Sequence, residues 1–260
     1  MRETRFELRH HFVVVPVELN GVERRFIFDS GIGLTLVRLG IDGCVAIGST
    51  FTGKRMSGQE VAVPLASAAS LAFAGVEARD VEIGLLDMSG FPPDLAETDG
   101  FLSLAFFRRQ PFTVDYQRGT IRDGRHTGRR VPIRVEIDGP SLTAFMALTI
   151  PGGRTIDVEL DMGSDTLILD ERFAAETGVQ LDAADVRKEE GVDETGHRYT
   201  RTFARLEGSI QPVDAPDLAQ HDPQVMFQRI IHDGLLGHAY LNKFIVTWDV
   251  PSSEIRLQRP

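Results

Sequence analysis

Phe-Ile-Phe-Asp-Ser-Gly at residues 26–31, followed by Leu-Thr-Leu-Val at 34–37, is the stretch from which the fold can be deduced. Apolar residues on both sides of Asp29 are typical of buried strands, so we expect the turn that carries this acid to lie deep in a β-core. A carboxylate in such a place is unfavourable unless it is hydrogen-bonded or paired. The sequence therefore predicts a partner for Asp29 elsewhere in the chain.

The same pattern recurs as Val-Glu-Leu-Asp-Met-Gly-Ser at residues 158–164, which places Asp161 132 positions after Asp29. Two further pairs of segments repeat at an offset of 134. Asp-Gly-Phe-Leu-Ser at 99–103 resembles Asp-Gly-Leu-Leu-Gly at 233–237, and Asp115 and Asp249 each lie beside an aromatic residue. Three matches at nearly constant offset indicate a tandem duplication with one acid in each copy.

Short apolar segments that alternate with turn residues predict an all-β protein with few helices. Strands are expected near 61–65, 70–76, 79–86 and 111–116, and the best helix signal covers 170–177, with Asp170 as N-cap and Gly178 as the stop. The polar segment 123–130 is the natural link between the copies. We therefore expect an N-terminal lobe at 1–128 and a C-terminal lobe at 129–260.

Each copy also contains a Gly-x4-Gly pattern between β-type residues, at 52–58 and at 190–196. The patterns read either as mobile surface turns or as hairpin flaps over a cleft. Their matched positions keep the second interpretation open. The glycines concerned are Gly53, Gly58, Gly191 and Gly196.

Composition and charge exclude several classes of protein. The net charge of −10 argues against nucleic-acid binding, which needs a basic surface. Cys44 is the only cysteine, so no internal disulfide can form, and the apolar run 12–15 is too short for a signal-peptide core or a membrane span. We expect a cytoplasmic, monomeric protein with no membrane partner and no obvious pro-segment to be removed.

These segments resemble the aspartic proteases of the pepsin and retropepsin type over nearly the whole chain. That family has an apolar strand, Asp-Thr/Ser-Gly, and later an apolar-apolar-Gly turn that crosses behind the acid. The resemblance implies a bilobal fold with pseudo-two-fold symmetry, in which one chain supplies both halves of the cleft. It implies catalytic roles for Asp29 and Asp161, no cofactor, and a peptide or protein substrate. The residues that it places around the substrate are Ser30, Gly31, Gly163, Ser164, Gly53, Gly58, Gly191 and Gly196.

Peptide hydrolysis by this route needs two carboxylates about 3 Å apart that share a proton, one as base and one as acid. The chain departs from the family at Met162, which cannot supply the hydroxyl that braces the two turns as Ser30 can. Ile32 is larger than the residue usual at its position, and Ser103 replaces a glycine. Because Ser164 could donate to Asp161, we expect Asp161 to be the base and Asp29 the acid.

Two other classes of function stay open. The fold could serve as a peptide-binding module without turnover, or the acid pair could perform general acid–base chemistry on a small molecule. The adjacent His10 and His11 read as a solvated or strand-edge pair rather than as metal ligands, because no third ligand has matching spacing.

Overall fold

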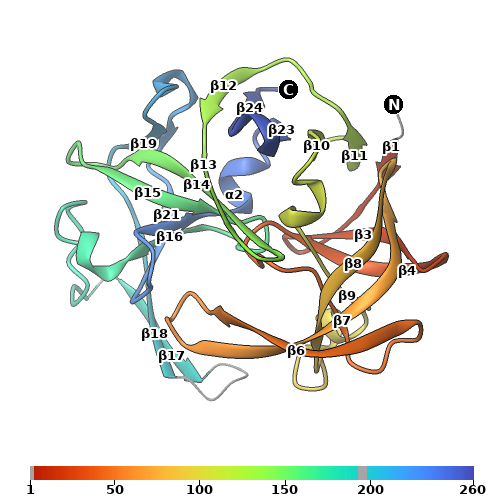
Figure 1. Cartoon of the computed structure of the whole chain (residues 1–260). Helices are drawn as coiled ribbons and strands as arrows, with labels where there is room; N and C mark the ends of the chain where they lie inside the picture. The colour runs from red at the N-terminus through yellow and green to blue at the C-terminus, as the bar shows by residue number, and fades with distance from the viewer. Residues whose placement is uncertain (1–2, 185, 193–197) are drawn as a thin grey trace.

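The computed structural model describes residues 3–184, 186–192 and 198–260 (Figure 1). Strands make up 56% of the chain and form three sheets, which confirms the prediction of a mostly β protein. Within these residues, no helix has the length and apolar character that crossing a membrane requires.

The first sheet comes from the N-terminal half and has the order β2-β3-β4-β9-β5-β8-β7-β6. Alternate residues of its central strands, among them Val13, Val15, Phe26 and Phe28, fill one side of the main core. The bounds are β2 (Glu7–Arg9), β3 (Phe12–Leu19), β4 (Val22–Asp29), β5 (Leu36–Arg38), β6 (Cys44–Lys54), β7 (Glu60–Phe73), β8 (Val76–Leu86) and β9 (Gly100–Ser103).

The second sheet comes from the C-terminal half and has the order β17-β18-β21-β16-β22-β15-β14-β19-β20, with β13 paired to the first residues of β14. The bounds are β13 (Arg134–Asp138), β14 (Ser141–Thr149), β15 (Thr155–Leu160), β16 (Leu167–Asp170), β17 (Arg187–Val192), β18 (Arg198–Arg205), β19 (Ser209–Pro212), β20 (Gln220–His221), β21 (Gln224–Gln228) and β22 (Gly234–Leu236).

The two sheets repeat one pattern of pairing. In the first, β4 and β9 are parallel and β9 is antiparallel to β5; in the second, β15 and β22 are parallel and β22 is antiparallel to β16. The strands farther out also correspond, since β5 with β8 and β16 with β21 are both parallel pairs. As a result, the C-terminal ends of β4 and β15, where the two predicted acids lie, occupy equivalent positions in the two sheets.

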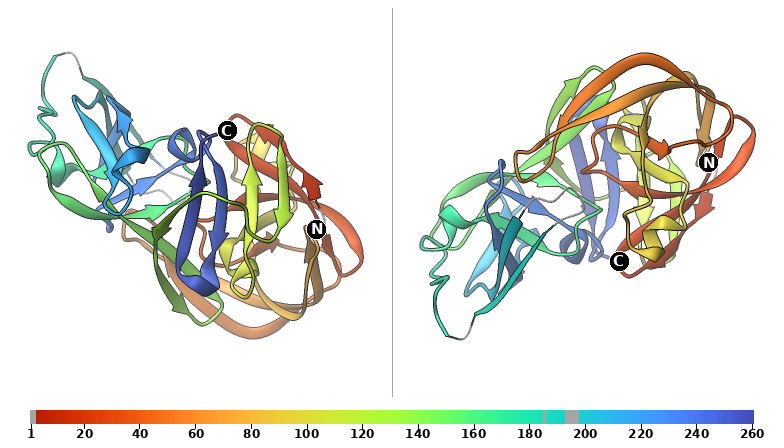
Figure 2. Two further views of the ribbon diagram at one scale, coloured as in Figure 1. Left: turned by 90° about the horizontal axis from the view of Figure 1, so that it is seen from above. Right: turned by 90° about the horizontal axis from the view of Figure 1, so that it is seen from below.

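The third sheet joins the halves, and Figure 2 shows its strands running between them. Its order, β1-β11-β10-β23-β24-β12, places three strands from each half on either side of a central contact between β10 and β23. At that contact the hydroxyls of Thr113 and Thr247 lie 2.8 Å apart. The bounds are β1 (Glu3–Arg5), β10 (Phe112–Asp115), β11 (Thr120–Asp123), β12 (Arg129–Pro132), β23 (Ile245–Asp249) and β24 (Glu254–Gln258).

The strand predictions agree with the structure, although the expected segments 61–65 and 70–76 are largely parts of one long strand, β7. The predicted link 123–130 contains a short loop between β11 and β12. Because the third sheet uses strands from both halves, the division at 128 and 129 separates two sets of strands that are hydrogen-bonded to each other.

The helix expected at 170–177 is wrong. Only a 3-10 turn, η2 (Glu171–Phe173), forms there, although the side chain of Asp170 does cap it by accepting from the Arg172 N–H. Gly178, as expected, has a positive φ of 79° and ends the turns. The other helical segments are also short: α1 (Pro93–Ala96), α2 (His238–Leu241), η1 (Leu104–Phe107), η3 (Pro216–Leu218) and η4 (Val250–Ser252).

The hairpin of β6 and β7 reaches from the first half to the second, along the lower edge of Figure 1. At its tip the carbonyl of Met56 accepts a hydrogen bond of 2.8 Å from the Ile231 N–H. The Met56 side chain packs against a cluster formed by Ile168, Met226, Ile230 and Leu235. The tip of this hairpin therefore rests on the second half of the molecule.

Candidate active site

The structure brings Asp29 and Asp161 together. Asp29 ends β4 and Asp161 directly follows β15, so both lie at the ends of central strands on equivalent turns. Their side chains are hydrogen-bonded to each other. Each carboxylate also accepts a 2.8 Å bond from the backbone N–H two residues later, that of Gly31 and that of Gly163 respectively. We call these two acids the dyad.

Gly31 and Gly163 allow each turn to approach the opposite acid. A Cβ on Gly31 would lie 2.5 Å from Cγ of Asp161, and a Cβ on Gly163 would lie 2.3 Å from Oδ2 of Asp29. Both distances are far below van der Waals contact, so no side chain fits at either position unless the acids move. The absence of a Cβ at Gly31 and Gly163 is thus a condition for the contact between the acids.

The brace between the two turns is one-sided, as the sequence predicts. The buried Ser30 hydroxyl donates to the Leu160 carbonyl at 2.8 Å and accepts from the Met162 N–H at 2.9 Å. Met162 is fully buried in the main core and returns no side-chain hydrogen bond. One hydroxyl therefore supplies both polar contacts of the brace.

Replacement of Ser30 by alanine is expected to destabilise the fold by about 2–3 kcal/mol, because the buried Met162 N–H loses its acceptor and the Leu160 carbonyl loses a donor. Denaturant unfolding of Ser30→Ala measures the effect. Ser49→Ala, which removes a hydroxyl from an exposed strand position, should stay within about 0.5 kcal/mol of the parent. Equal stabilities for the two variants would contradict the brace.

The structure also shows the surroundings of Ser164 and Ile32, the residues that follow the two glycines of the turns. The predicted hydrogen bond from Ser164 to Asp161 is wrong, because the Ser164 hydroxyl donates instead to the Thr166 carbonyl, at 3.4 Å. Ile32, larger than the family pattern requires, is accommodated because its side chain packs against the apolar cluster of the first half.

Ser103, which stands where the family pattern has a glycine, is accommodated by hydrogen bonds. Its hydroxyl lies 3.2 Å from that of Thr35 and accepts from the Ala105 N–H, so the buried oxygen is satisfied. The equivalent Gly237 has no such room, since a Cβ there would lie 2.4 Å from the Ser164 carbonyl oxygen. The two turns thus differ because the chain passes closer in the second half.

Electrostatics distinguish the two acids. Burial raises the pKa of Asp29, and hydrogen bonds from Gly31, Asp161 and Gly163 oppose that rise. Burial, followed by the negative charges of Asp29 and Glu159, raises the pKa of Asp161 well above its ordinary value. The pKa of Asp161 is thus raised further than that of Asp29, and the proton that they share belongs to the pair. The assignment of base and acid from Ser164 loses its basis, because that hydroxyl donates elsewhere.

Two residues near the dyad were not recognised from the sequence. His11, expected to be solvated or at a strand edge, is partly buried and its Nε2–H donates to the Gly163 carbonyl at 3.0 Å. Glu159 is 6% exposed and has Nε2 of His232 at 3.5 Å. The signal in the sequence that could have predicted a site role for Glu159 is its position two residues before Asp161, in a strand end that is otherwise apolar.

Glu159 should make stability fall as the pH rises. Burial, assisted by the charges of Asp29 and Glu136, raises its pKa from 4.5 to about 8. Between these values the unfolded chain loses the proton while the folded chain keeps it, which weakens folding by up to about 4–5 kcal/mol.

We therefore expect Glu159→Gln to be more stable than the parent at pH 8. The difference should shrink as the pH falls and vanish below the ordinary pKa of 4.5, where Glu159 is protonated in both the folded and the unfolded parent. Unfolding measured across this range tests the prediction. The exposed Glu207→Gln, which changes net charge equally, should show no such trend. A difference that does not depend on pH would contradict the buried, protonated state of Glu159.

The remaining predicted residues lie in the two hairpins. Gly53 is in β6, and Gly58 is at the hairpin tip, with a positive φ of 86° and a missing Cβ that would contact Ile231 at 2.9 Å. Gly191 is in β17, opposite Tyr199 of β18. Gly196 lies outside the described residues. The tip of the first hairpin thus contacts the second half. For the second hairpin, the structure describes the pairing of its two strands, β17 and β18.

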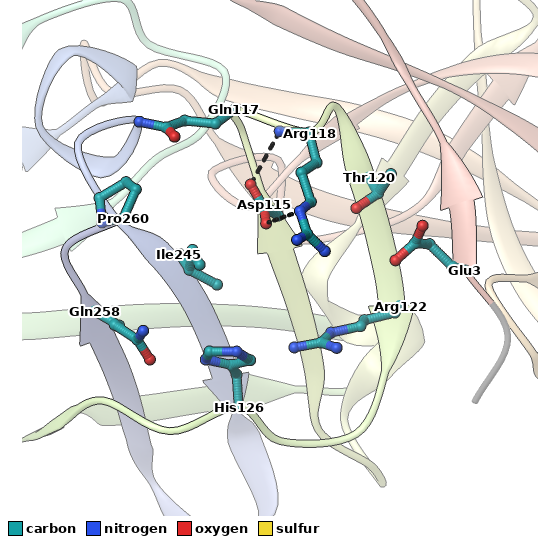
Figure 3. A pocket seen from close by; sticks show the side chains of 10 residues that line it. All are labelled: Glu3, Asp115, Gln117, Arg118, Thr120, Arg122, His126, Ile245, Gln258 and Pro260. Carbon is teal, nitrogen blue, oxygen red and sulfur yellow. Dashed lines mark hydrogen bonds and ion pairs between the residues drawn. The ribbon is translucent and has the colours of Figure 1, made fainter.

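A cavity of about 300 Å³ lies away from the dyad, on the third sheet. Figure 3 shows its polar lining, in which Arg118 bonds to Asp115 through its backbone N–H at 3.0 Å and its side chain. Neither acid of the dyad lines this cavity. It therefore offers no access to the candidate active site.

In comparisons with known proteins, no protein-family model matches the chain and no curated protein matches it.

Proposed function

We propose that this chain is an aspartic endopeptidase with a pepsin- and retropepsin-like bilobal fold and that the dyad hydrolyses the peptide bond. The observation that carries the proposal is the pair of hydrogen-bonded acids, Asp29 and Asp161, on equivalent turns of two sheets with the same strand pairing. The resemblance of the surrounding sequence to that family supports it.

The chemistry follows from the unequal acids. Ionised Asp29 takes a proton from a water molecule, whose oxygen attacks the peptide carbonyl carbon, while Asp161 gives its proton to the carbonyl oxygen. The product is a neutral tetrahedral diol. Asp29 then passes its proton to the amide nitrogen, the C–N bond breaks, and Asp161 recovers a proton from a diol hydroxyl. Both acids end in their starting states, so the dyad itself supplies acid and base.

The first hairpin would have to lift before a peptide could bind. Its tip is held by the Ile231–Met56 hydrogen bond and by the packing of Met56 against the second half. An extended peptide would bind beneath it as a β-strand, with main-chain hydrogen bonds supplying much of the affinity. The proposal thus assigns the hairpin the part of a flap.

Incubation with a mixed peptide library, read by mass spectrometry, tests the proposal. We expect internal cleavage that is blocked by a statine-type transition-state analogue, because such a compound places a hydroxyl where the attacking water lies. Cleavage insensitive to the analogue would point to a contaminating enzyme of another class. Binding of peptides without cleavage would identify a peptide-binding module instead, and the absence of both would reject a peptide substrate.

A further inference from the structure

A row of side chains crosses the second sheet on the same face as Asp161. Arg134 pairs with Phe145, Phe145 with Glu159, Glu159 with Leu235, and Leu235 with Ile168. Directly paired residues place their side chains on one face of a sheet, and residues two apart on a strand share that face. Glu159 therefore lies on the dyad side of its sheet, next to Asp161.

The equivalent row of the first half begins with the exposed Glu7, opposite Val14, and its four inner positions are apolar. Its paired residues are Val14, Ile27, Phe101 and Leu36, which belong to one buried cluster. Ile27 precedes Asp29 by two positions, as Glu159 precedes Asp161. Position 159 is thus where an acid replaces the apolar residue of the matching row.

The carboxyl of Glu159 lacks a close cationic partner among the described residues. Its ion pair with His232 is long, at 3.5 Å, and burial lowers the pKa of that histidine, which disfavours its positive charge. Arg134, in the same row, is bonded to Asp157 at 2.7 Å and to Glu136, and its guanidinium lies over the Phe145 ring. The Glu159 carboxyl, buried beside the dyad, is therefore available to bind a cationic group of a ligand.

We infer that Glu159 selects peptides with a lysine or arginine side chain next to the scissile bond, on the second-half side of the dyad. This inference rests on the proposed function. An ammonium or guanidinium group would give the buried carboxyl the hydrogen-bonded cation that it otherwise lacks, and guanidinium can do so through two parallel bonds. The overall charge of −10 favours the approach of basic peptides.

The bound cation would also change the protonation of Glu159. A positive charge at hydrogen-bond distance favours the ionised carboxylate and so lowers the pKa of Glu159 from the value of about 8 that it has without ligand. The apolar residues beside it, Phe145 and Leu235, would contact the aliphatic part of the lysine or arginine side chain.

The test uses the best-cleaved library peptide, resynthesised with Lys, Arg, Gln or Met at each residue flanking the cleaved bond. At one of the two positions kcat/KM should be at least about tenfold higher for Lys and Arg than for Met. In Glu159→Gln this ratio should fall toward one, and in Glu207→Gln, which alters an exposed acid, it should remain. A ratio unchanged by Glu159→Gln, or absent in the parent, would overturn the inference while hydrolysis itself stands.

Binding separates the two proposals if no peptide is cleaved. The library peptide that binds most tightly is labelled and resynthesised with Lys, Arg, Gln or Met at its central positions. Fluorescence polarisation then measures the affinity of each version for the parent chain and for Glu159→Gln. A preference for basic peptides that needs Glu159 would support the inference although hydrolysis fails. Binding without a preference would reject the basic subsite alone, and no binding would reject both the basic subsite and the peptide substrate.

Discussion

Asp29→Asn and Asp161→Asn are each expected to lower kcat for peptide hydrolysis by roughly 10³–10⁴-fold. Asparagine keeps the size of the side chain but can neither ionise nor transfer its proton, so the pair loses its base in the first variant and its acid in the second. The double variant should lose about as much activity as either single variant and not the product of the two losses, because the two carboxyls act as a unit.

The parent should show a bell-shaped dependence of kcat/KM on pH. Activity rises as the first proton leaves the dyad and falls as the second leaves, and both steps belong to the pair. Asp42→Asn, at an exposed turn, serves as the control and should leave the profile unchanged. Wild-type rates in Asp29→Asn would remove the dyad from the mechanism.

Gly163→Ala and Gly31→Ala are expected to reduce kcat by about 10²-fold or more while the chain still folds. The added methyl group would lie 2.3 Å from Oδ2 of Asp29 in the first variant and 2.5 Å from Cγ of Asp161 in the second. Each must push the opposite carboxyl aside by an ångström or so, and misplacement on that scale is sufficient for a loss of this size.

Gly90→Ala is the matched control, because a Cβ there meets no atom within 4 Å. Unfolding curves and peptide hydrolysis should be measured for all three variants. If Gly163→Ala hydrolysed peptides as fast as Gly90→Ala does, the acids would not need the close approach that the structure gives them.

The part of the site that could be predicted from sequence is local. Apolar runs around Asp29 and Asp161 predict buried strand ends, and a hydroxyl next to Asp29 predicts a brace between turns. Ser30 does make those contacts. The strand ends and the brace depend on residues adjacent to the acids in the chain, so the local sequence is sufficient to predict them.

The parts that failed depend on residues brought together by folding. The order of the two acids was predicted from a Ser164–Asp161 hydrogen bond, whereas Ser164 donates to Thr166 and burial is the main cause that raises the pKa of both acids. Glu159 acts through its burial, which follows from pairing with strands far away in sequence. His11 reaches Gly163 across 152 positions. No local pattern carries this information.

The predicted helix after Asp170 failed for a related reason. Its capping residue is correct, but Asp170 also accepts from the Ile230 N–H, at 2.9 Å, and so is fixed to a distant segment. The main chain then closes in 3-10 and isolated turns rather than in continuous α-helix. A tertiary contact has overridden a short helical propensity.

The third sheet has a consequence for dissection of the gene product. Since β10 and β23 pair along four residues at its centre, fragments 1–128 and 129–260 would each expose an unsatisfied inner strand edge. Co-expressed as separate polypeptides, they should recombine into a non-covalent heterodimer. Expressed alone, each fragment should either dimerise by pairing its exposed strand edge with that of a second copy or aggregate and precipitate.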